Sequence, residues 1–153
     1  MSQETSGPWV AIAVICETAL QEASGVLSLI RVVDRFQVAG PTTEMQPVNL
    51  KFTIVVAFKA GFSRNSAIVS IKPIPPSNKD VAPIEASVLF EGEDRGVNLV
   101  LNIPGFQVSE QGLYWFDVSV DGVLFTRIPL RIMYQKVSGT MPGLPGLPPN
   151  PGR

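Results

Sequence analysis

The stretch that decides the fold is GLYWFDVSVDGVLFTRIPLRI, residues 112–132. In its first half, apolar residues stand at every second position: Tyr114, Phe116, Val118 and Val120. In its second half the same spacing resumes at Leu124, Ile128, Leu130 and Ile132. The intervening Asp121-Gly122 suits a type I′ turn, in which both central residues take a positive φ. A period of two on either side of such a turn predicts an antiparallel hairpin with one buried face.

The rest of the chain repeats this pattern of short apolar runs separated by turn residues. Six further strands are predicted, at residues 9–16, 26–36, 50–60, 66–72, 84–90 and 97–103. Residues 18–24 are poor in β-branched residues and favour a loop or one helical turn. Pro73 should end the strand that begins at Ser66, and Pro104-Gly105 should break the one that begins at Val97. About eight strands without a convincing helix predict an all-β fold.

Two architectures suit eight short strands, a sandwich of two antiparallel sheets and a small barrel. We favour an antiparallel β-sandwich of Ig-like or C2-like architecture. The first three strands are apolar on much of both faces, so we expect them in the middle of their sheets. Pro129 cannot donate a ladder hydrogen bond, so the last strand should lie at an edge or carry a bulge there.

Composition limits the function more than it identifies it. Apolar residues make up 45% of the chain and the formal net charge is −1, which excludes a disordered polar chain and disfavours a nucleic-acid binder. There is no histidine, the commonest general base and a common zinc ligand, so we expect no enzyme, no metal and no cofactor. The single cysteine, Cys16, stands among apolar residues and should be buried. No apolar run is long enough to span a membrane, and we expect a cytoplasmic protein.

The chain divides into three parts. Residues 1–7 should be a mobile lead, residues 8–136 the folded domain, and residues 137–153 a Pro/Gly-rich flexible tail. The tail repeats the triplet Pro-Gly-Leu, and proline at this density favours polyproline II and excludes sheet pairing. A disordered tail is the simpler interpretation, and a docking segment for an aromatic groove on a partner is the alternative. The tail residues that could make such contacts are Pro142, Leu144, Pro145, Leu147 and Pro148.

Three motifs together resemble a known family. They are the strand ending in Cys16-Glu17 with the following GVLSLIRVVDRF at 25–36, Pro104-Gly105 before the 112–122 hairpin strand, and Ile128-Pro129-Leu130. The set resembles a family of small uncharacterised bacterial β-sandwich proteins, classed as a domain of unknown function, over most of residues 9–133 and without the tail. The resemblance implies that fold and a bacterial or phage-related source. It implies no catalytic residue.

Few side chains suggest chemistry. On the alternation above, Trp115 and Phe125 face outward on neighbouring strands. They could form a sugar-stacking platform or a protein contact, or they could be covered by the tail or by a loop. The acidic turn with Glu91, Glu93 and Asp94 could hold calcium, although a solvated hairpin turn is the simpler interpretation. Asp34, between Arg31 and Arg35, could sit in a catalytic cleft, although a salt bridge at the end of its strand is the simpler interpretation.

We therefore expect a non-catalytic interaction module that contacts a protein partner or a second copy of itself. The contact would be made through an edge strand, the outer aromatics or the tail. The alternative is a sandwich that binds a carbohydrate or another small ligand.

Overall fold

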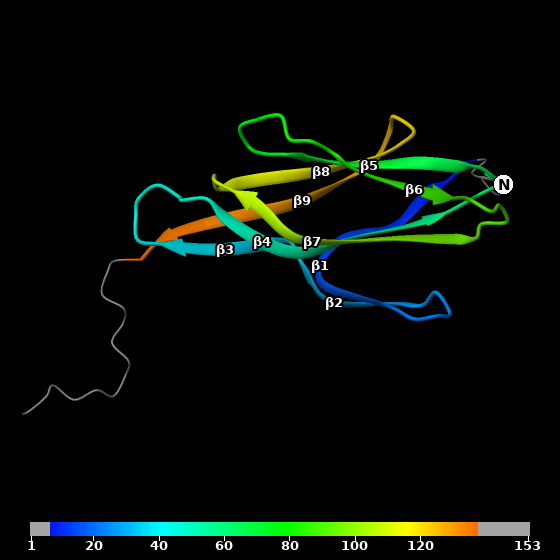
Figure 1. The fold of residues 1–153 in the computed structure, drawn as a ribbon, viewed down its shortest axis with the longest axis horizontal. Coiled ribbons are helices and arrows are strands. Elements are labelled where there is room, and N and C mark those ends of the chain that lie inside the picture. Colours follow the sequence, from blue (N-terminus) through cyan, green and yellow to red (C-terminus); the bar gives the residue numbers. More distant parts are fainter. Residues whose placement is uncertain (1–6, 138–153) are drawn as a thin grey trace, which may run out of the picture.

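The computed structural model describes residues 7–137, and these form nine β-strands without a helix (Figure 1). The strands are β1 (Trp9–Gln21), β2 (Leu27–Val33), β3 (Arg35–Gly40), β4 (Val48–Lys59), β5 (Ser66–Ile74), β6 (Ile84–Leu89), β7 (Gly96–Val108), β8 (Gly112–Val120) and β9 (Val123–Lys136). They form a four-stranded sheet in the order β2-β1-β4-β7 and a five-stranded sheet in the order β3-β9-β8-β5-β6. The all-β prediction is confirmed. The predicted lead, residues 1–7, and the predicted tail, residues 137–153, lie outside the described residues except for Gly7 and Val137.

The two sheets face each other across one apolar core. Phe52 of β4 meets Phe116 of β8 edge to face, with ring centroids 5.9 Å apart. All seven predicted inward residues of the hairpin outside its turn region are buried, namely Tyr114, Phe116, Val118, Val120, Ile128, Leu130 and Ile132. Asp121 and Gly122 take φ values of 46° and 82°, as the type I′ turn requires. The sequence therefore identified the central hairpin and its buried face.

The predicted strand 26–36 is wrong, because Asp34 divides it. β2 pairs with β1 in the first sheet, whereas β3 pairs with β9 in the second. The backbone N–H of Arg131 donates to the carbonyl of Asp34 at 2.9 Å, where the chain crosses between the sheets. The β3–β9 pair is parallel, so the second sheet is mixed and not purely antiparallel as predicted. β2 and β3 end up at sheet edges, while β1 and β4 hold the interior positions expected for them.

Three predicted strand ends are also wrong. β1 continues to Gln21 through the segment predicted as loop or helical turn, because residues 15–21 pair with β2. β5 passes through Pro73, which lies opposite Phe116, and ends at Ile74. β7 passes through Pro104-Gly105, which form a bulge: Leu50 pairs with Phe106 and Phe52 with Ile103, so β7 carries one extra residue.

Pro129 lies in an interior strand, but on the part of it where one side is open. The backbone N–H of Arg131 points toward β3. Backbone groups of a strand point to the same side at every second residue, so the nitrogen of Pro129 also points away from β8. The β3 pairing begins only at Arg131, so no ladder bond is lost at Pro129. The bulge in this strand lies elsewhere, at Phe125.

Candidate functional site

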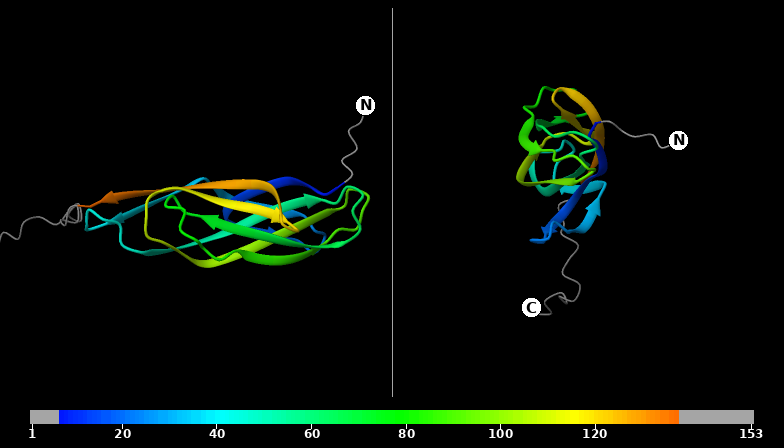
Figure 2. Two further views of the ribbon diagram at one scale, coloured as in Figure 1. Left: turned by 90° about the horizontal axis from the view of Figure 1, so that it is seen from above. Right: turned by 90° about the vertical axis from the view of Figure 1, so that its right-hand side faces the viewer.

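The most unusual feature is a hairpin flap, residues 17–33, made of the second half of β1, its turn and β2. β1 pairs with β4 only as far as Cys16 and then continues alone with β2. Figure 2 shows this hairpin standing off the two sheets. Opposite Glu17, Arg31 takes a φ of 57°, and its guanidinium pairs with the Glu17 carboxylate at 3.1 Å. This left-handed residue marks the place where the hairpin leaves the plane of its sheet.

The flap turns back over the outer face of the four-stranded sheet. The side-chain amide of Asn98, on β7, donates to the carbonyl of Gly25 in the flap turn at 3.1 Å. β7 is two strands away from β1, so the turn must lie across β4 to reach it. On that outer face Thr53, Val55 and Ala57 are buried although they point away from the core. The hairpin therefore covers part of this face.

The side chains on the two faces of the flap differ in solvent exposure. Ala19, Leu27 and Leu29 share one face and are half-buried. The other face carries apolar side chains that remain exposed: Leu20 at 53%, Ile30 at 43% and Val32 at 59%. Val26, at the turn, is 55% exposed. A cluster of exposed aliphatic residues on a projecting hairpin is typical of an interaction surface.

The outer edge of the flap is open. β2 pairs with β1 on one side and has no strand on the other. The N–H of Glu22 donates to the carbonyl of Val26, so Val26 and every second residue after it face β1. Leu27 and Leu29 therefore direct their backbone N–H and C=O groups outward. Arg31, with its left-handed backbone, ends this regular edge after Ile30.

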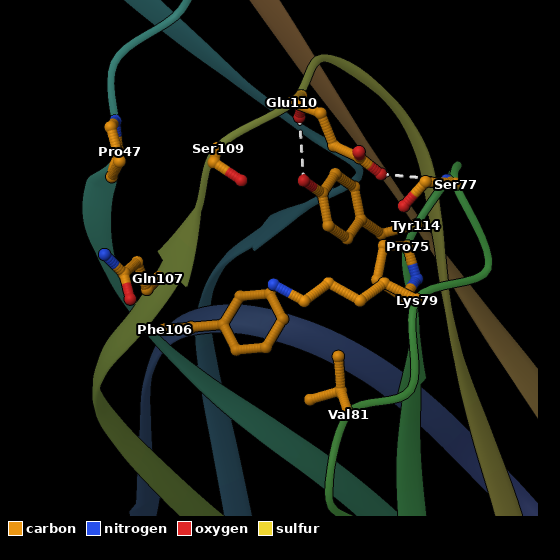
Figure 3. A pocket seen from close by; sticks show the side chains of 10 residues that line it. All are labelled: Pro47, Pro75, Ser77, Lys79, Val81, Phe106, Gln107, Ser109, Glu110 and Tyr114. Carbon is orange, nitrogen blue, oxygen red and sulfur yellow. Dashed lines mark hydrogen bonds between the residues drawn. The ribbon is translucent and has the colours of Figure 1, made fainter.

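A second feature is a cleft of about 480 Å³ between the ends of the two sheets (Figure 3). Phe106 forms its floor, and the bulge at Pro104-Gly105 turns this ring toward Phe52 and Phe116, with centroids 5.8 and 5.5 Å away. The walls come from the β3–β4, β5–β6 and β7–β8 connections. Pro47, Pro75, Ser77, Lys79, Ser109 and Glu110 are among their lining residues.

Hydrogen bonds fix one wall of this cleft. The Tyr114 hydroxyl donates to the carbonyl of Glu110 at 2.7 Å, and the Glu110 carboxylate accepts from the backbone N–H of Ser77 at 2.8 Å. Burial raises the pKa of Tyr114 above its ordinary value, so the ring stays neutral. Within residues 7–137, the side chains of Gln107, Ser109 and Lys79 make no hydrogen bond or ion pair. They are donors available to a ligand.

The predicted aromatic pair does not exist. Trp115 is half-buried on the outer face of its sheet, and the Arg127 guanidinium carbon lies 4.7 Å from its ring centroid. Phe125 was predicted beside it, but it is the extra residue of a bulge and packs on Phe58, with centroids 6.5 Å apart. The same bulge turns Leu124, predicted inward, to 52% exposure. Pro142, Leu144, Pro145, Leu147 and Pro148 lie outside the described residues.

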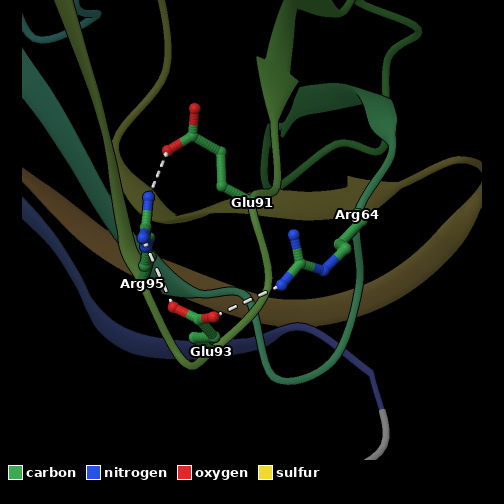
Figure 4. Close-up of polar contacts among 4 residues, drawn as sticks. All are labelled: Arg64, Glu91, Glu93 and Arg95. Atoms are coloured by element: carbon green, nitrogen blue, oxygen red, sulfur yellow. Dashed lines mark hydrogen bonds and ion pairs between the residues drawn. The ribbon is translucent and has the colours of Figure 1, made fainter.

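The acidic turn at residues 91–94, for which calcium binding and a solvated hairpin turn were both considered, carries ion pairs with arginines. Glu93 lies between two arginines, 3.4 Å from Arg64 and 3.3 Å from Arg95, and Glu91 pairs with Arg95 at 3.6 Å (Figure 4). Among residues 7–137 there is no group of three His, Cys, Asp or Glu residues that could hold a metal ion. The carboxylates here join two neighbouring turns of the chain.

Two further predictions concern single residues. The Asp34 carboxylate pairs with Arg35 at 3.1 Å, as predicted, while Arg31 pairs with Glu17 instead. The hydrogen bond and charge of Arg35 lower the pKa of Asp34. Cys16 is buried and free, as predicted, and burial raises the pKa of its thiol. Asp34 lines a small cavity together with Arg35, Leu113, Pro129 and Arg131.

Sequence reasoning missed the flap and the cleft. The sequence did contain one indication of the flap. Residues 26–33 are apolar on both faces, and Gly25 before them and the charged Asp34 after them mark the two ends of a separate short strand. The signal for the cleft was the odd spacing between Ile103 and Phe106 around Pro-Gly, because these two apolar side chains share one face of the strand only if a bulge intervenes.

Comparison with known proteins shows the family. Residues 11–133 match the model of a family of unknown function, DUF6941, and the chain belongs to it. This confirms the resemblance to an uncharacterised domain. No curated protein matches the chain. In the part of the chain that the structure describes, no helix is long and apolar enough to cross a membrane.

Proposed function

We propose that this protein is a non-catalytic interaction module that binds an extended segment of a protein partner along β2. We propose also that its two facing sheets form a β-sandwich of Ig-like or C2-like architecture, in a bacterial cytoplasmic protein. The observation that carries the functional proposal is the open edge of β2 on a projecting, apolar flap. The absence of histidine from the chain supports a role in binding rather than in acid–base chemistry.

The partner adds one strand to the flap. Backbone groups of Leu27 and Leu29 supply hydrogen bonds that do not depend on sequence, as in other cases of strand addition to a sheet edge. Selectivity comes from the exposed face with Leu20, Ile30 and Val32, which accepts apolar side chains at alternate positions of the partner. Arg31 limits the paired segment to a few residues, so the interaction is short and reversible.

The test is photo-cross-linking in cells of the source organism, with a photoreactive residue at the exposed Ser28 of the flap. We expect one or a few proteins to be cross-linked. The double variant Ile30→Lys/Val32→Lys should lose these products, because it places two charges on the apolar face. Ile68→Lys, at an equally exposed position (48%) on β5, is the matched control and should keep them.

A second variant tests backbone pairing along β2 separately from the apolar side-chain face of the flap. Leu29→Pro removes an outward N–H but no hydrogen bond to β1, so it should block strand addition and leave the hairpin paired. Circular dichroism checks that each variant is folded. Products that survive both flap variants would exclude β2 as the binding edge. Products found only with a second copy of this chain would make the module a self-associating one.

The cleft supports a second candidate, the binding of a carbohydrate or another small polar ligand. Its volume of about 480 Å³ lies within the range of ligand pockets, and it combines an aromatic floor with free amide and hydroxyl donors. A glycan array with wild type and Gln107→Ala tests this, with Asn49→Ala as an exposed amide control outside the cleft. Binding that is lost only in Gln107→Ala would support this second function.

A further inference from the structure

One wall of the cleft carries a lysine whose backbone is held in place. Lys79 belongs to the connection between β5 and β6, and residues before and after it are anchored. The N–H of Ser77 donates to the Glu110 carboxylate at 2.8 Å. The carboxylate of Asp80 pairs with Lys72 at 3.3 Å. The wall is therefore formed before a ligand arrives, which lowers the entropy cost of binding there.

The cleft contains an unmatched positive charge. Figure 3 shows the Lys79 side chain extended across the cleft in the direction of Phe106. Within residues 7–137 its ammonium group pairs with no carboxylate, and the other charged lining residue, Glu110, is turned toward the N–H of Ser77. A single free ammonium matches a single carboxylate. A phosphate group carries a charge of about −1.5 to −2, and the lining has one lysine and no arginine to match it.

The other polar groups of the lining suit a ligand with several hydroxyl groups. The Gln107 amide and the Ser109 hydroxyl can each donate and accept a hydrogen bond. One oxygen of the Glu110 carboxylate accepts from the N–H of Ser77, and the other accepts no hydrogen bond within the part of the chain that the structure describes. An alkyl or aryl acid would desolvate these groups without pairing them, which costs binding free energy. The hydroxyls of a sugar ring can pair with them.

The floor and the size of the cleft also fit a sugar. Phe106 is half-buried: its ring packs on Phe52 and Phe116 behind it and lines the cleft in front. Such a ring offers a flat apolar surface on which the C–H groups of one face of a pyranose can pack. A volume of about 480 Å³ lies in the lower half of the range of ligand pockets, so the occupant is small, about one or two sugar rings.

We propose that the cleft binds an acidic sugar, a pyranose that bears a carboxylate. The carboxylate pairs with the Lys79 ammonium, and one face of the ring packs on Phe106. The hydroxyls bond to Gln107, Ser109 and the free oxygen of Glu110. This inference rests on the second candidate function, ligand binding in the cleft, and does not depend on the flap.

The test is an array of oligosaccharides that contain uronic or sialic acids, each printed beside the same glycan with its carboxylates reduced to alcohols. We expect the wild-type protein to bind at least one acidic glycan and to bind its reduced form about tenfold or more weakly, because a hydrogen bond to a charged group is lost. Gln107→Ala should weaken both forms, since the amide pairs with hydroxyls that both forms retain.

A lysine variant tests the charge by itself. Lys79→Gln should bring the acidic glycan down to the level of its reduced form, because it removes the ammonium and keeps a polar side chain. Lys51→Gln, at an exposed lysine of β4 outside the cleft, is the matched control and should keep the difference.

The outcomes separate the ligand class from the site. Binding that needs Gln107 but does not distinguish the two forms of a glycan would overturn the assignment of an acidic sugar and leave ligand binding in the cleft standing. A preference for the acid that survives Lys79→Gln would do the same. Wild-type protein that binds no glycan of either form would exclude both the acidic sugar and carbohydrate binding in the cleft.

Discussion

Asn98 holds Gly25 across 73 positions of sequence, through a 3.1 Å hydrogen bond from its side-chain amide to the glycine carbonyl. This bond joins the tip of the flap to the far strand of its own sheet. It is the one polar contact within the described residues that ties the flap turn to β7. The turn of the proposed binding element is therefore tied to β7 by the side chain of Asn98, which is half-buried.

Asn98→Ala should loosen the flap without unfolding the protein. An exposed hydrogen bond contributes about 0.5–1.5 kcal/mol, so the cost in global stability should be at or below about 1 kcal/mol. Hydrogen exchange should become faster for amides of residues 18–32 and stay unchanged in β4. Asn49→Ala, at an exposed asparagine of β4, serves as the control. Equal exchange in both variants would mean that the flap is held by packing alone.

Phe116→Ala should cost about 3–5 kcal/mol of unfolding free energy, because it empties a site between two packed rings. Phe116 is 1% exposed and lies within 6 Å of Phe52 and Phe106 by ring centroids. Urea denaturation followed by circular dichroism measures the change. A loss below about 1 kcal/mol would show that the inward face of the hairpin contributes little to the core.

Tyr114 should make the protein less stable at alkaline pH. Its pKa is raised by burial, so its contribution to stability is complete below the ordinary tyrosine value and is lost as the pH rises through the folded-state value. Tyr114→Phe should cost about 0.5–1.5 kcal/mol at neutral pH, through the lost bond to Glu110, but should show a weaker alkaline decline. Thermal melts between about pH 8 and 11 test this around the ordinary tyrosine pKa. Cys16 adds to the same decline in both proteins, so the difference reports on the tyrosine.

Tyr134→Phe is the control for that experiment. It removes the hydroxyl that donates to Thr42 and leaves Tyr114 in place. It should therefore retain the alkaline decline of the parent protein. Identical pH profiles for Tyr114→Phe and the parent would contradict the role given to Tyr114.

Arg127→Ala should expose Trp115. The guanidinium lies over the indole ring, and its Nε donates to Asp117 at 2.6 Å. We expect a red shift of tryptophan emission and a loss of about 0.5–1 kcal/mol of stability, as for an exposed cation–π contact. Arg95→Ala, which removes two exposed ion pairs at a turn, should leave the emission unchanged. An unshifted spectrum in Arg127→Ala would show that the ring is covered by other groups.

The sequence by itself determined the strands and the central hairpin. Alternation with a period of two follows from strand geometry, so it identified every buried residue of β8 and the turn at Asp121-Gly122. The paired Asp34, the buried Cys16 and the solvated acidic turn also followed from local chemistry. The tertiary structure decided what depends on pairing between distant segments. Asp34 divides one apolar run because each half finds a different sheet, and β1 extends through 18–21 because β2 lies beside it.

Bulges account for the rest of the difference. One extra residue reverses the alternation beyond it, so Phe125 turned inward, Leu124 outward and Phe106 into the core. No local pattern shows where a partner strand will accommodate an extra residue. Pairing between distant segments also produced the candidate sites. The cleft has a floor because of one bulge, and the flap exists because β1 leaves β4 after Cys16 and continues with β2 alone. Strand identity is a local property, whereas register and sheet membership are set by which distant edges meet.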